Sequence, residues 1–392
     1  MAKIVVVTDM DEQGSGYKNL CVPLLTGLVE KGHEVKIAGL GYQGKEHNYP
    51  FSVIPAGTIQ DAHAIANNLC YVWQPDIILV AMDIPLQEYF YGSLRATLKR
   101  IPQEVAQGLT VDRKYIAITP LENGPLTLSW AAILLNMDSV FFISELGKQE
   151  AIKAGLTKAE HLIVGVDTVF WHPATLEEKK QLRKGLGIGD DEFVVITVAD
   201  NQERKNLWAG LESIQLLKEQ TDKKVRYVLV TRPDSPVGYK LNDLSIEMGL
   251  TKELMIFNRG LPVQDLWGLY AVSDVYLSTS KAEGLGMPVL EAMACGVLCV
   301  ATDTGALHEL LEDEKGLLIE PYYEFRDVWG NSRRDMINTI KASNALWMQS
   351  VGLNNFNSRM RDRALDSVRD RTWDIPVTQI HQAIEGLLNV KK

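Results

Sequence analysis

The feature that most limits how this chain can fold is a regular alternation of short β-branched runs with longer segments of helical periodicity. Each β-branched run predicts a buried strand, and a helix between two such strands indicates a parallel sheet with helices on its faces. A first series of strands is predicted at Lys3–Met10, Glu34–Leu40, Asp76–Met82, Tyr115–Thr119 and Ser139–Ser144. A second series is predicted at Glu192–Ala199, Val225–Thr231, Leu254–Phe257, Val275–Thr279 and Leu298–Thr302.

The two series predict an α/β protein with two Rossmann-like domains, residues 1–168 and 169–372, followed by a C-terminal helix at 373–392 that crosses back to the first domain. The stretch Ile163–Pro173 mixes Gly, Asp and Pro, which is typical of a linker between domains. Ligands of parallel sheets bind at the carboxyl ends of the strands, so a cleft between the two domains is the expected site.

Composition and charge exclude several classes of protein. Of the 392 residues, 46% are hydrophobic and 23% charged, which excludes a disordered chain. No apolar run approaches the roughly 20 residues that span a bilayer, and Met1 is not followed by a signal-peptide pattern. The four cysteines have neither disulfide-framework nor zinc-site spacing, so we expect a reducing cytoplasm.

The net charge of −10 disfavours nucleic acid as a partner. One basic cluster, Arg95–Arg100, could contact an anionic membrane surface, although a solvated helix face is the preferred interpretation. The oligomeric state is left open by the sequence.

The strongest motif is Ser280–Gly296, SKAEGLGMPVLEAMACG. A loop with Gly284 and Gly286 separates a predicted strand from a predicted helix, so backbone amides and the positive helix end would favour phosphate or sugar oxygens. The carboxylates of Glu283 and Glu291 could face the same small region and accept hydrogen bonds from hydroxyl groups. The alternative is a helix start whose acidic residue only complements the helix dipole.

A second motif, Ala199–Leu207, follows the first strand of the second series. Here Arg204 and Lys205 are predicted to open a helix. Two cations at a helix start can neutralise a leaving diphosphate without a metal ion. The alternative is an exposed basic helix start.

Ser280–Gly296 resembles the signature of the retaining GT-B glycosyltransferases, in particular the large family 4, whose mark is two glutamates separated by seven residues around a glycine-containing loop. The resemblance implies the GT-B fold, with two facing Rossmann-like domains. It implies that Glu291 holds the ribose hydroxyls of a nucleoside-diphosphate sugar. It further implies that sugar and diphosphate are held by Glu283 and by the amides of Gly284, Leu285, Gly286 and Met287.

Other segments resemble the family in order along the chain: Gly32–Val35, Val164–Pro173, Thr302–Pro321 and Trp373. By this resemblance Lys205 matches the family's diphosphate-binding Lys, and backbone around Ile256 and Asn258 brackets the nucleotide base. Asp200 departs from the family, which usually has Arg there, and Arg204 would supply the missing charge from another direction.

Two loops of the first domain are further candidates. Gly14, Ser15 and Gly16 follow the first strand and are predicted to close over donor and acceptor. The neighbouring Asp9–Asp11 also matches a D-x-D pattern, which binds a metal in GT-A enzymes, but we predict no metal here.

The second candidate loop of the first domain is Thr119–Leu126, which contains Glu122. Family members often carry a His near this position, and this loop has none. Glu122 would orient or deprotonate an acceptor hydroxyl, or else the segment is only a turn before a helix.

These motifs predict a retaining glycosyltransferase that uses a nucleoside-diphosphate sugar, requires no cofactor, and transfers to a glycan, lipid or small-molecule hydroxyl. No paired nucleophile and acid is evident, so a front-face displacement is the expected mechanism, in which the leaving phosphate helps to take the acceptor proton. The alternatives are a GT-B sugar-nucleotide epimerase or phosphorylase, and a non-catalytic nucleotide-sugar-binding protein.

Overall fold

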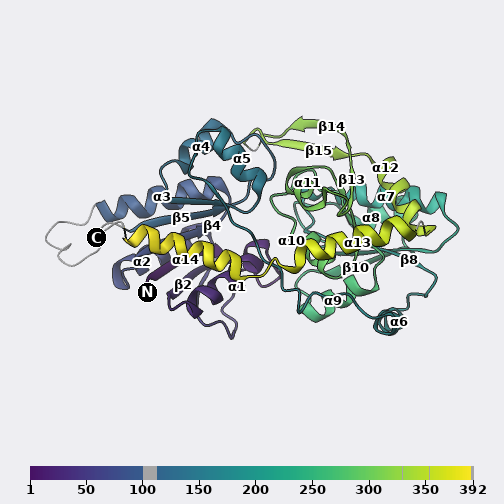
Figure 1. Ribbon diagram of the computed structural model, residues 1–392, viewed down its shortest axis with the longest axis horizontal. Helices are drawn as coiled ribbons and strands as arrows, with labels where there is room; N and C mark the ends of the chain where they lie inside the picture. The colour runs from purple at the N-terminus through teal and green to yellow at the C-terminus, as the bar shows by residue number, and fades with distance from the viewer. Residues whose placement is uncertain (100–112, 329, 353, 390–392) are drawn as a thin grey trace. The chain divides into compact units, whose positions relative to one another are not determined.

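The computed structural model describes residues 1–99, 113–328, 330–352 and 354–389 (Figure 1). The chain divides into two compact units. Unit 1 comprises Met1–Gly165 together with Trp373–Lys392, and unit 2 comprises Val166–Thr372. The side chains of the basic cluster Arg95–Arg100 lie outside the described residues, so its predicted membrane contact stays a prediction.

Unit 1 is built on a parallel sheet whose strands, in spatial order, are β3-β2-β1-β4-β5-β6-β7. The strands are β1 (Lys3–Asp9), β2 (Glu34–Leu40), β3 (Ser52–Ala56), β4 (Ile77–Ala81), β5 (Lys114–Thr119), β6 (Ser139–Phe142) and β7 (Glu160–His161). The helices are α1 (Gly16–Glu30), α2 (Ile59–Val72), α3 (Ile84–Lys99), α4 (Leu128–Leu134), α5 (Glu145–Lys153) and α14 (Asp374–Asn389).

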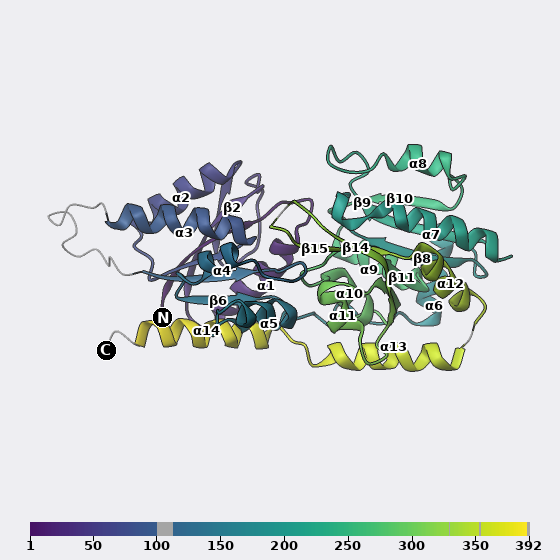
Figure 2. The same ribbon diagram turned by 90° about the horizontal axis from the view of Figure 1, so that it is seen from above.

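The centre of this sheet is fully buried because helices cover both of its faces. Val5 and Val7 of β1 alternate with Ile4 and Val6, and all four are 0% exposed. Val5 and Val7 pack into one cluster with residues of α2 and α3. Figure 2 shows α2 and α3 on one side of the strands and α14 on the other.

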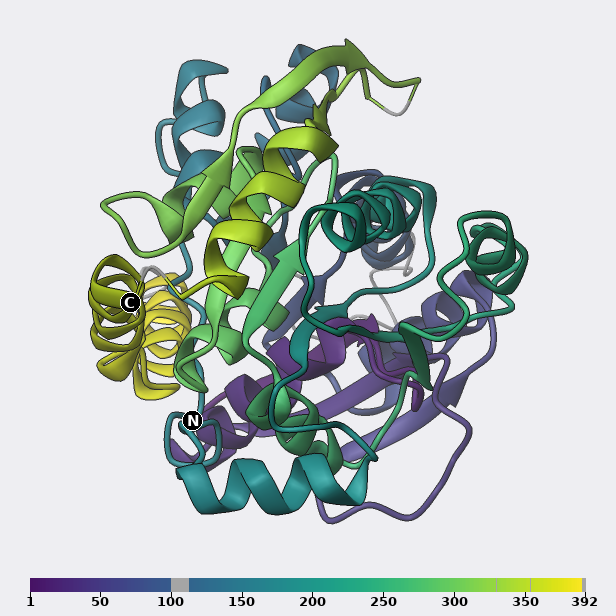
Figure 3. The same cartoon turned by 90° about the vertical axis from the view of Figure 1, so that its right-hand side faces the viewer.

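Unit 2 repeats this plan with a parallel sheet in the order β10-β9-β8-β11-β12-β13 and a separate antiparallel pair, β14-β15. Its strands are β8 (Phe193–Val198), β9 (Val225–Thr231), β10 (Leu254–Asn258), β11 (Val275–Ser278), β12 (Leu298–Thr302), β13 (Leu317–Ile319), β14 (Pro321–Arg326) and β15 (Arg333–Ile337). Its helices are α6 (Leu176–Gly185), α7 (Leu207–Gln220), α8 (Leu241–Glu247), α9 (Val263–Val272), α10 (Met287–Ala294), α11 (Gly305–Leu311), α12 (Thr339–Ser350) and α13 (Asn354–Arg369). The β14-β15 hairpin, light green in Figure 3, extends away from the parallel sheet.

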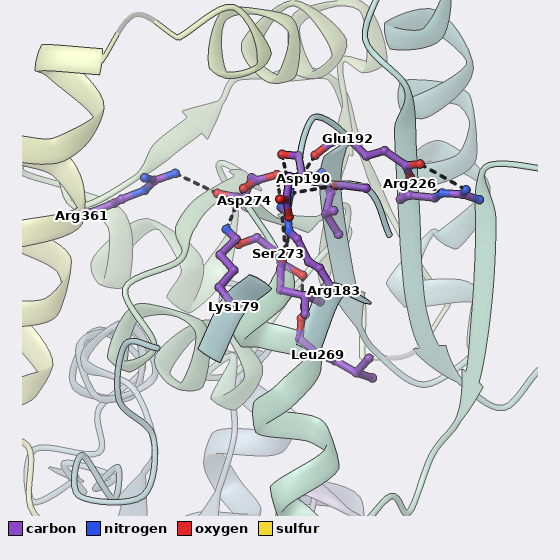
Figure 4. A network of polar contacts seen from close by, with 12 residues as sticks. Lys179, Arg183, Asp190, Glu192, Arg226, Leu269, Ser273, Asp274 and Arg361 are labelled. Carbon is purple, nitrogen blue, oxygen red and sulfur yellow. Dashed lines mark hydrogen bonds and ion pairs between the residues drawn. The ribbon is translucent and has the colours of Figure 1, made fainter. Parts of the chain in front are cut away.

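A network of polar contacts fixes the amino ends of the strands in unit 2 (Figure 4). Arg183 of α6 donates to Val272 O at 3.0 Å and to Asp274 Oδ2 at 2.8 Å, and Lys179 Nζ lies 2.8 Å from Asp274 Oδ1. Arg361 of α13 donates to Asp274 O at 3.0 Å. Burial would raise the pKa of Asp274, but the charges of Lys179 and Arg183 lower it below its usual value. The network therefore ties two helices to the sheet at the edge opposite the loops discussed below.

Neither a membrane-spanning helix nor a cluster of metal ligands is found among the described residues. None of the helices there is long and apolar enough to cross a membrane. Within the same residues, no group of three or more His, Cys, Asp and Glu side chains is arranged to hold a metal ion.

Candidate functional site

The candidate residues of unit 2 gather at the carboxyl ends of β8 and β11, which are neighbouring strands of the sheet. Carboxyl ends are where parallel sheets bind ligands. The loops that follow these two strands surround a small hollow of about 290 Å³, counting open space at its mouth. Its lining residues are Thr197, Val198, Ala199, Lys205, Tyr276, Ser278, Thr279, Ser280, Glu283, Gly286, Pro288, Val289 and Leu307.

The loop after β11 is held in shape by its backbone. Gly286 caps α10 in the left-handed conformation, with φ 89° and ψ 51°. A Cβ there would lie 2.9 Å from Leu307 Cδ2, so glycine serves both the conformation and the packing. Glu283 O accepts a hydrogen bond of 2.8 Å from Ala306 N, which fastens the loop to α11. The loop thus leads directly into the first turn of α10, whose amides lack intrahelical acceptors.

Glu283 is the centre of an ionic cluster within the hollow. Its Oε2 lies 2.5 Å from Lys205 Nζ and 3.3 Å from Arg204 Nη1, and it accepts from Ser280 Oγ at 3.2 Å. Burial would raise the pKa of Glu283, but the charges of Lys205 and Arg204 lower it to about 2. The structure therefore brings Glu283, Lys205 and Arg204 together from segments 78 and 79 residues apart.

The expectation that Arg204 and Lys205 open a helix is wrong in detail. They lie in a short 3-10 turn, Glu203–Lys205, and α7 begins only at Leu207. Asn206, which lies between this turn and α7, has a left-handed backbone conformation with φ 51°. Asn tolerates this conformation better than most residues do, and it keeps the turn and α7 from forming one continuous helix. Thr279 Oγ1 donates to Asn206 O at 3.0 Å and so ties this turn to the end of β11.

Glu291 has quite different surroundings. It is 6% exposed, does not line the hollow, and accepts a hydrogen bond of 2.9 Å at Oε2 from the hydroxyl of Tyr270 on α9. Burial raises the pKa of Glu291 to about 7, and the Tyr270 hydrogen bond opposes that rise. Tyr270 was not expected at the site, because the sequence motif carries no sign of a partner 21 positions away.

Asp200, which follows β8, is bound by two arginines from the next strands of the sheet. It accepts from Arg232 Nε at 2.7 Å, after β9, and lies 3.1 Å from Arg259 Nη1, after β10. Burial would raise the pKa of Asp200, but the hydrogen bond from Arg232 and the charge of Arg259 lower it. Two arginines therefore place positive charge beside Asp200 at this edge of the sheet. Arg204 contacts Glu283 and Ala282 O.

The remaining unit 2 candidates lie in two places. Gly284, Leu285 and Met287 share the loop and helix start described above, and Leu285 is buried. Ile256 and Asn258 belong to β10, the strand at the edge of the sheet, where Ile256 is half-buried and Asn258 is exposed.

The candidates of unit 1 lie at the carboxyl edge of its own sheet. Gly14 has φ 90°, and Ser15 caps α1 by accepting from Tyr17 N at 3.2 Å; Gly16 is the first residue of that helix. The Tyr17 hydroxyl donates to Asp83 Oδ1 at 2.6 Å, and burial and then the charge of Asp83 raise the pKa of Tyr17. Glu122 is half-buried in the loop between β5 and α4.

The two aspartates of the D-x-D pattern are used by the backbone nearby. Asp9 Oδ1 accepts from Asp11 N at 2.8 Å, and Asp11 Oδ1 accepts from Gln13 N at 2.9 Å. These are the turn-forming contacts typical of Asp after a strand.

Comparison with known proteins gives a family match within the second unit. Residues 178–327 match the family model described as glycosyl transferases group 1. EpsD of Bacillus subtilis strain 168 is 30% identical over 158 residues, which cover 40% of each chain. The O-antigen chain mannosyltransferase B of Escherichia coli is 28% identical over 190 residues, covering 47% of this chain and 44% of the relative. The chain thus spans less than half the length of these curated relatives.

Among solved structures, Anabaena Alr3699/HepE, in complex with UDP and glucose, superimposes with a TM-score of 0.74 at 17% sequence identity. That superposition covers 98% of this chain and 100% of the other. The two parallel-sheet units and this similarity confirm the predicted fold class. The chain has the GT-B fold, and residues 178–327 of its second unit match the family model of the group 1 glycosyl transferases.

Proposed function

We propose that this protein is a glycosyltransferase that moves a sugar from a nucleoside-diphosphate sugar to an acceptor hydroxyl with retention of configuration. The observation that carries the proposal is the cluster of Lys205, Arg204 and Glu283 beside the glycine-capped start of α10. Two of the similar proteins support it: one is named as a mannosyltransferase, and the other was crystallised with UDP and glucose.

In this proposal the donor's diphosphate takes the place of Glu283 as the partner of Lys205 and Arg204. The cations and the first amides of α10 then stabilise the negative charge that develops on the leaving diphosphate. Released from its ion pairs, the Glu283 carboxylate accepts hydrogen bonds from the hydroxyls of the donor sugar. Glu291 accepts from the ribose hydroxyls, and Ile256 and Asn258 lie beside the base.

The transfer step needs no protein nucleophile. The bond between the anomeric carbon and the leaving phosphate oxygen breaks, and the acceptor oxygen forms its bond on the same face. The acceptor proton passes to the departing phosphate oxygen. Unit 1 would supply the acceptor side, with Gly14–Gly16 closing over the reactants and Glu122 orienting the acceptor hydroxyl of a glycan, lipid or small molecule. Positioning and charge stabilisation are then the main work of the protein.

A thermal-shift screen against UDP, GDP, ADP and their sugars tests the donor proposal. A ligand that binds only the native state at 100 times its Kd adds about 2.7 kcal/mol to the free energy of unfolding. We expect one base to raise the melting temperature clearly above the other two. No shift with any of these compounds would contradict the proposal.

Transfer is tested next with the stabilising sugar nucleotide and a panel of acceptors, by following nucleotide release and the anomeric configuration of the product. Release that requires an acceptor and gives a retained product supports the proposal. Isomerised sugar from the donor alone would identify an epimerase, and binding without release across the panel would identify a non-catalytic binder.

A further inference from the structure

Tyr270 is a buried tyrosine whose hydroxyl faces a buried carboxylate. The side chain is 0% exposed, and its ring packs edge-on against Trp171, with ring centroids 5.7 Å apart and planes at 88°. The hydroxyl lies 2.9 Å from Glu291 Oε2 and 3.2 Å from Pro288 O. Because the ring is fixed by its packing, the hydroxyl holds a defined position beside the first two turns of α10.

The contacts of the Glu291 carboxylate differ from those of the Glu283 carboxylate. Within the described part of the chain, Tyr270 provides the hydrogen bond to the Glu291 carboxylate, and no Lys or Arg forms an ion pair with it. Glu283, eight positions earlier, has two cations and a serine hydroxyl instead. A buried carboxylate that lacks a cation needs a hydrogen-bond donor to remain ionised and oriented.

We infer that Tyr270 is a positioning residue for nucleotide binding: its hydroxyl holds one oxygen of Glu291, which directs the other oxygen toward the paired ribose hydroxyls of the donor. This inference rests on the proposed function. It adds to that function a residue from α9, outside the motif between β11 and α10, that determines how well the carboxylate accepts the ribose.

The arrangement makes nucleotide binding depend on pH. The titratable groups that face Glu291 are Tyr270, Tyr276 and Cys295, and burial raises the pKa of each of them, so all three stay neutral near pH 7. The tyrosine hydrogen bond is thus the contact that lowers the pKa of Glu291 against the effect of burial. Without it, a larger fraction of Glu291 is protonated at neutral pH, and a neutral carboxyl is the weaker acceptor.

The test is calorimetric titration with the nucleoside diphosphate that stabilises the wild-type protein, measured from pH 5.5 to 8.5. We expect wild-type affinity to rise with pH around neutrality. Tyr270→Phe should weaken binding about tenfold at pH 7, the loss typical of a hydrogen bond to a charged group, and should move the midpoint of the pH profile upward. Glu291→Gln should bind weakly with a flat profile, and Tyr270→Phe/Glu291→Gln should bind no more weakly than Glu291→Gln alone.

Tyr227→Phe is the matched control. Tyr227 is also 0% exposed, and the substitution removes its buried hydrogen bond of 2.9 Å to Thr197 Oγ1. It should keep the wild-type pH midpoint. Two results would overturn the inference alone: a Tyr270→Phe profile that matches the wild type, or losses that add in the double variant. A wild-type protein that binds none of UDP, GDP and ADP would overturn the proposed function and this inference with it.

Discussion

At the scale of single residues, Glu283 and Glu291 show how neighbours decide the chemistry of a side chain. They belong to one motif, in which Glu291 is buried and Glu283 is half-buried. Cations lower the pKa of Glu283 to about 2, whereas burial beside Tyr270 raises the pKa of Glu291 to about 7. Glu283 is therefore an anion near neutral pH, whereas the charge of Glu291 changes with pH around neutrality.

Lys205→Ala should lower kcat/KM for transfer by about 100- to 1000-fold, because it removes a cation that we assign to the leaving diphosphate. The circular dichroism spectrum should be unchanged. Lys223→Ala, an exposed lysine before β9 at the other end of the sheet, is the control and should keep wild-type kinetics. Near-normal transfer by the Lys205 variant would contradict its assignment to the diphosphate.

Glu291→Gln should stabilise the fold at pH 8 while weakening nucleotide binding. The folded-state pKa of Glu291 is raised, so the group's contribution to stability is complete below the unfolded pKa of about 4.5 and is lost as pH rises through about 7. Above pH 7 the ionised carboxylate costs on the order of 1–3 kcal/mol, which the neutral amide avoids. Urea unfolding at pH 5 and pH 8 checks this: the advantage of the variant should appear only at pH 8, and equal differences at both pH values would count against it.

At the scale of elements, hydrophobic pattern predicted the buried strands well. Val225–Thr231 and Leu298–Thr302 are predicted to the residue, because both are apolar on two faces and bounded by turns. The edge strand β3 was missed because it contains Pro55 and is largely half-exposed, so its pattern is weak. The hairpin β14-β15 was missed for a similar reason: its strands, PYYEFR and RRDMI, carry charged residues and no continuous apolar run.

The candidate site was less accessible to sequence reasoning, since its contacts depend on which strands become neighbours. The pairing of Asp200 with Arg232 and Arg259 requires β8, β9 and β10 to be adjacent, and no local pattern states that order. The roles assigned to Glu283, Lys205 and the other site residues came from the motif and its resemblance to a family, and they stay predictions.

Gly286→Ala should destabilise unit 2 by about 1–2 kcal/mol, because alanine is strained in the left-handed cap and its Cβ would press on Leu307. Chemical denaturation measures the loss. Gly386→Ala, in α14 with no atom within 4 Å of the new Cβ, is the control and should be neutral or stabilising by up to about 1 kcal/mol. Equal changes in the free energy of unfolding for the two substitutions would contradict the view that Gly286 is needed for the left-handed cap.

At the scale of the whole molecule, the last helix belongs to the first unit. Gln379 of α14 donates to His161 O at 2.7 Å and accepts from Ile163 N at 3.0 Å. His381 lies 2.9 Å from the ring of the buried His33. Unit 1 is therefore completed by a segment that follows all of unit 2 in the sequence.

Gly27→Ala should disturb this helix packing. Its new Cβ would clash with Val377 Cγ2 on α14, so α1 and α14 must separate, at a cost of about 1–3 kcal/mol. Thermal unfolding should show the loss, and Gly27→Ala/Val377→Ala should recover part of it. Nucleotide affinity, which we assign to unit 2, should stay at the wild-type value, and a parallel loss of affinity would refute that separation.

The position of α14 has a consequence for how the protein is made. During synthesis the ribosome releases β1 to β7 first, then the whole of unit 2, and only then the helix that packs against α1. Unit 2 can fold as one continuous stretch of chain while an apolar face of the nascent unit 1 is still uncovered, because α14 has not yet been synthesised. Unit 2 is thus the earlier of the two units to be complete, although it comes second in the sequence.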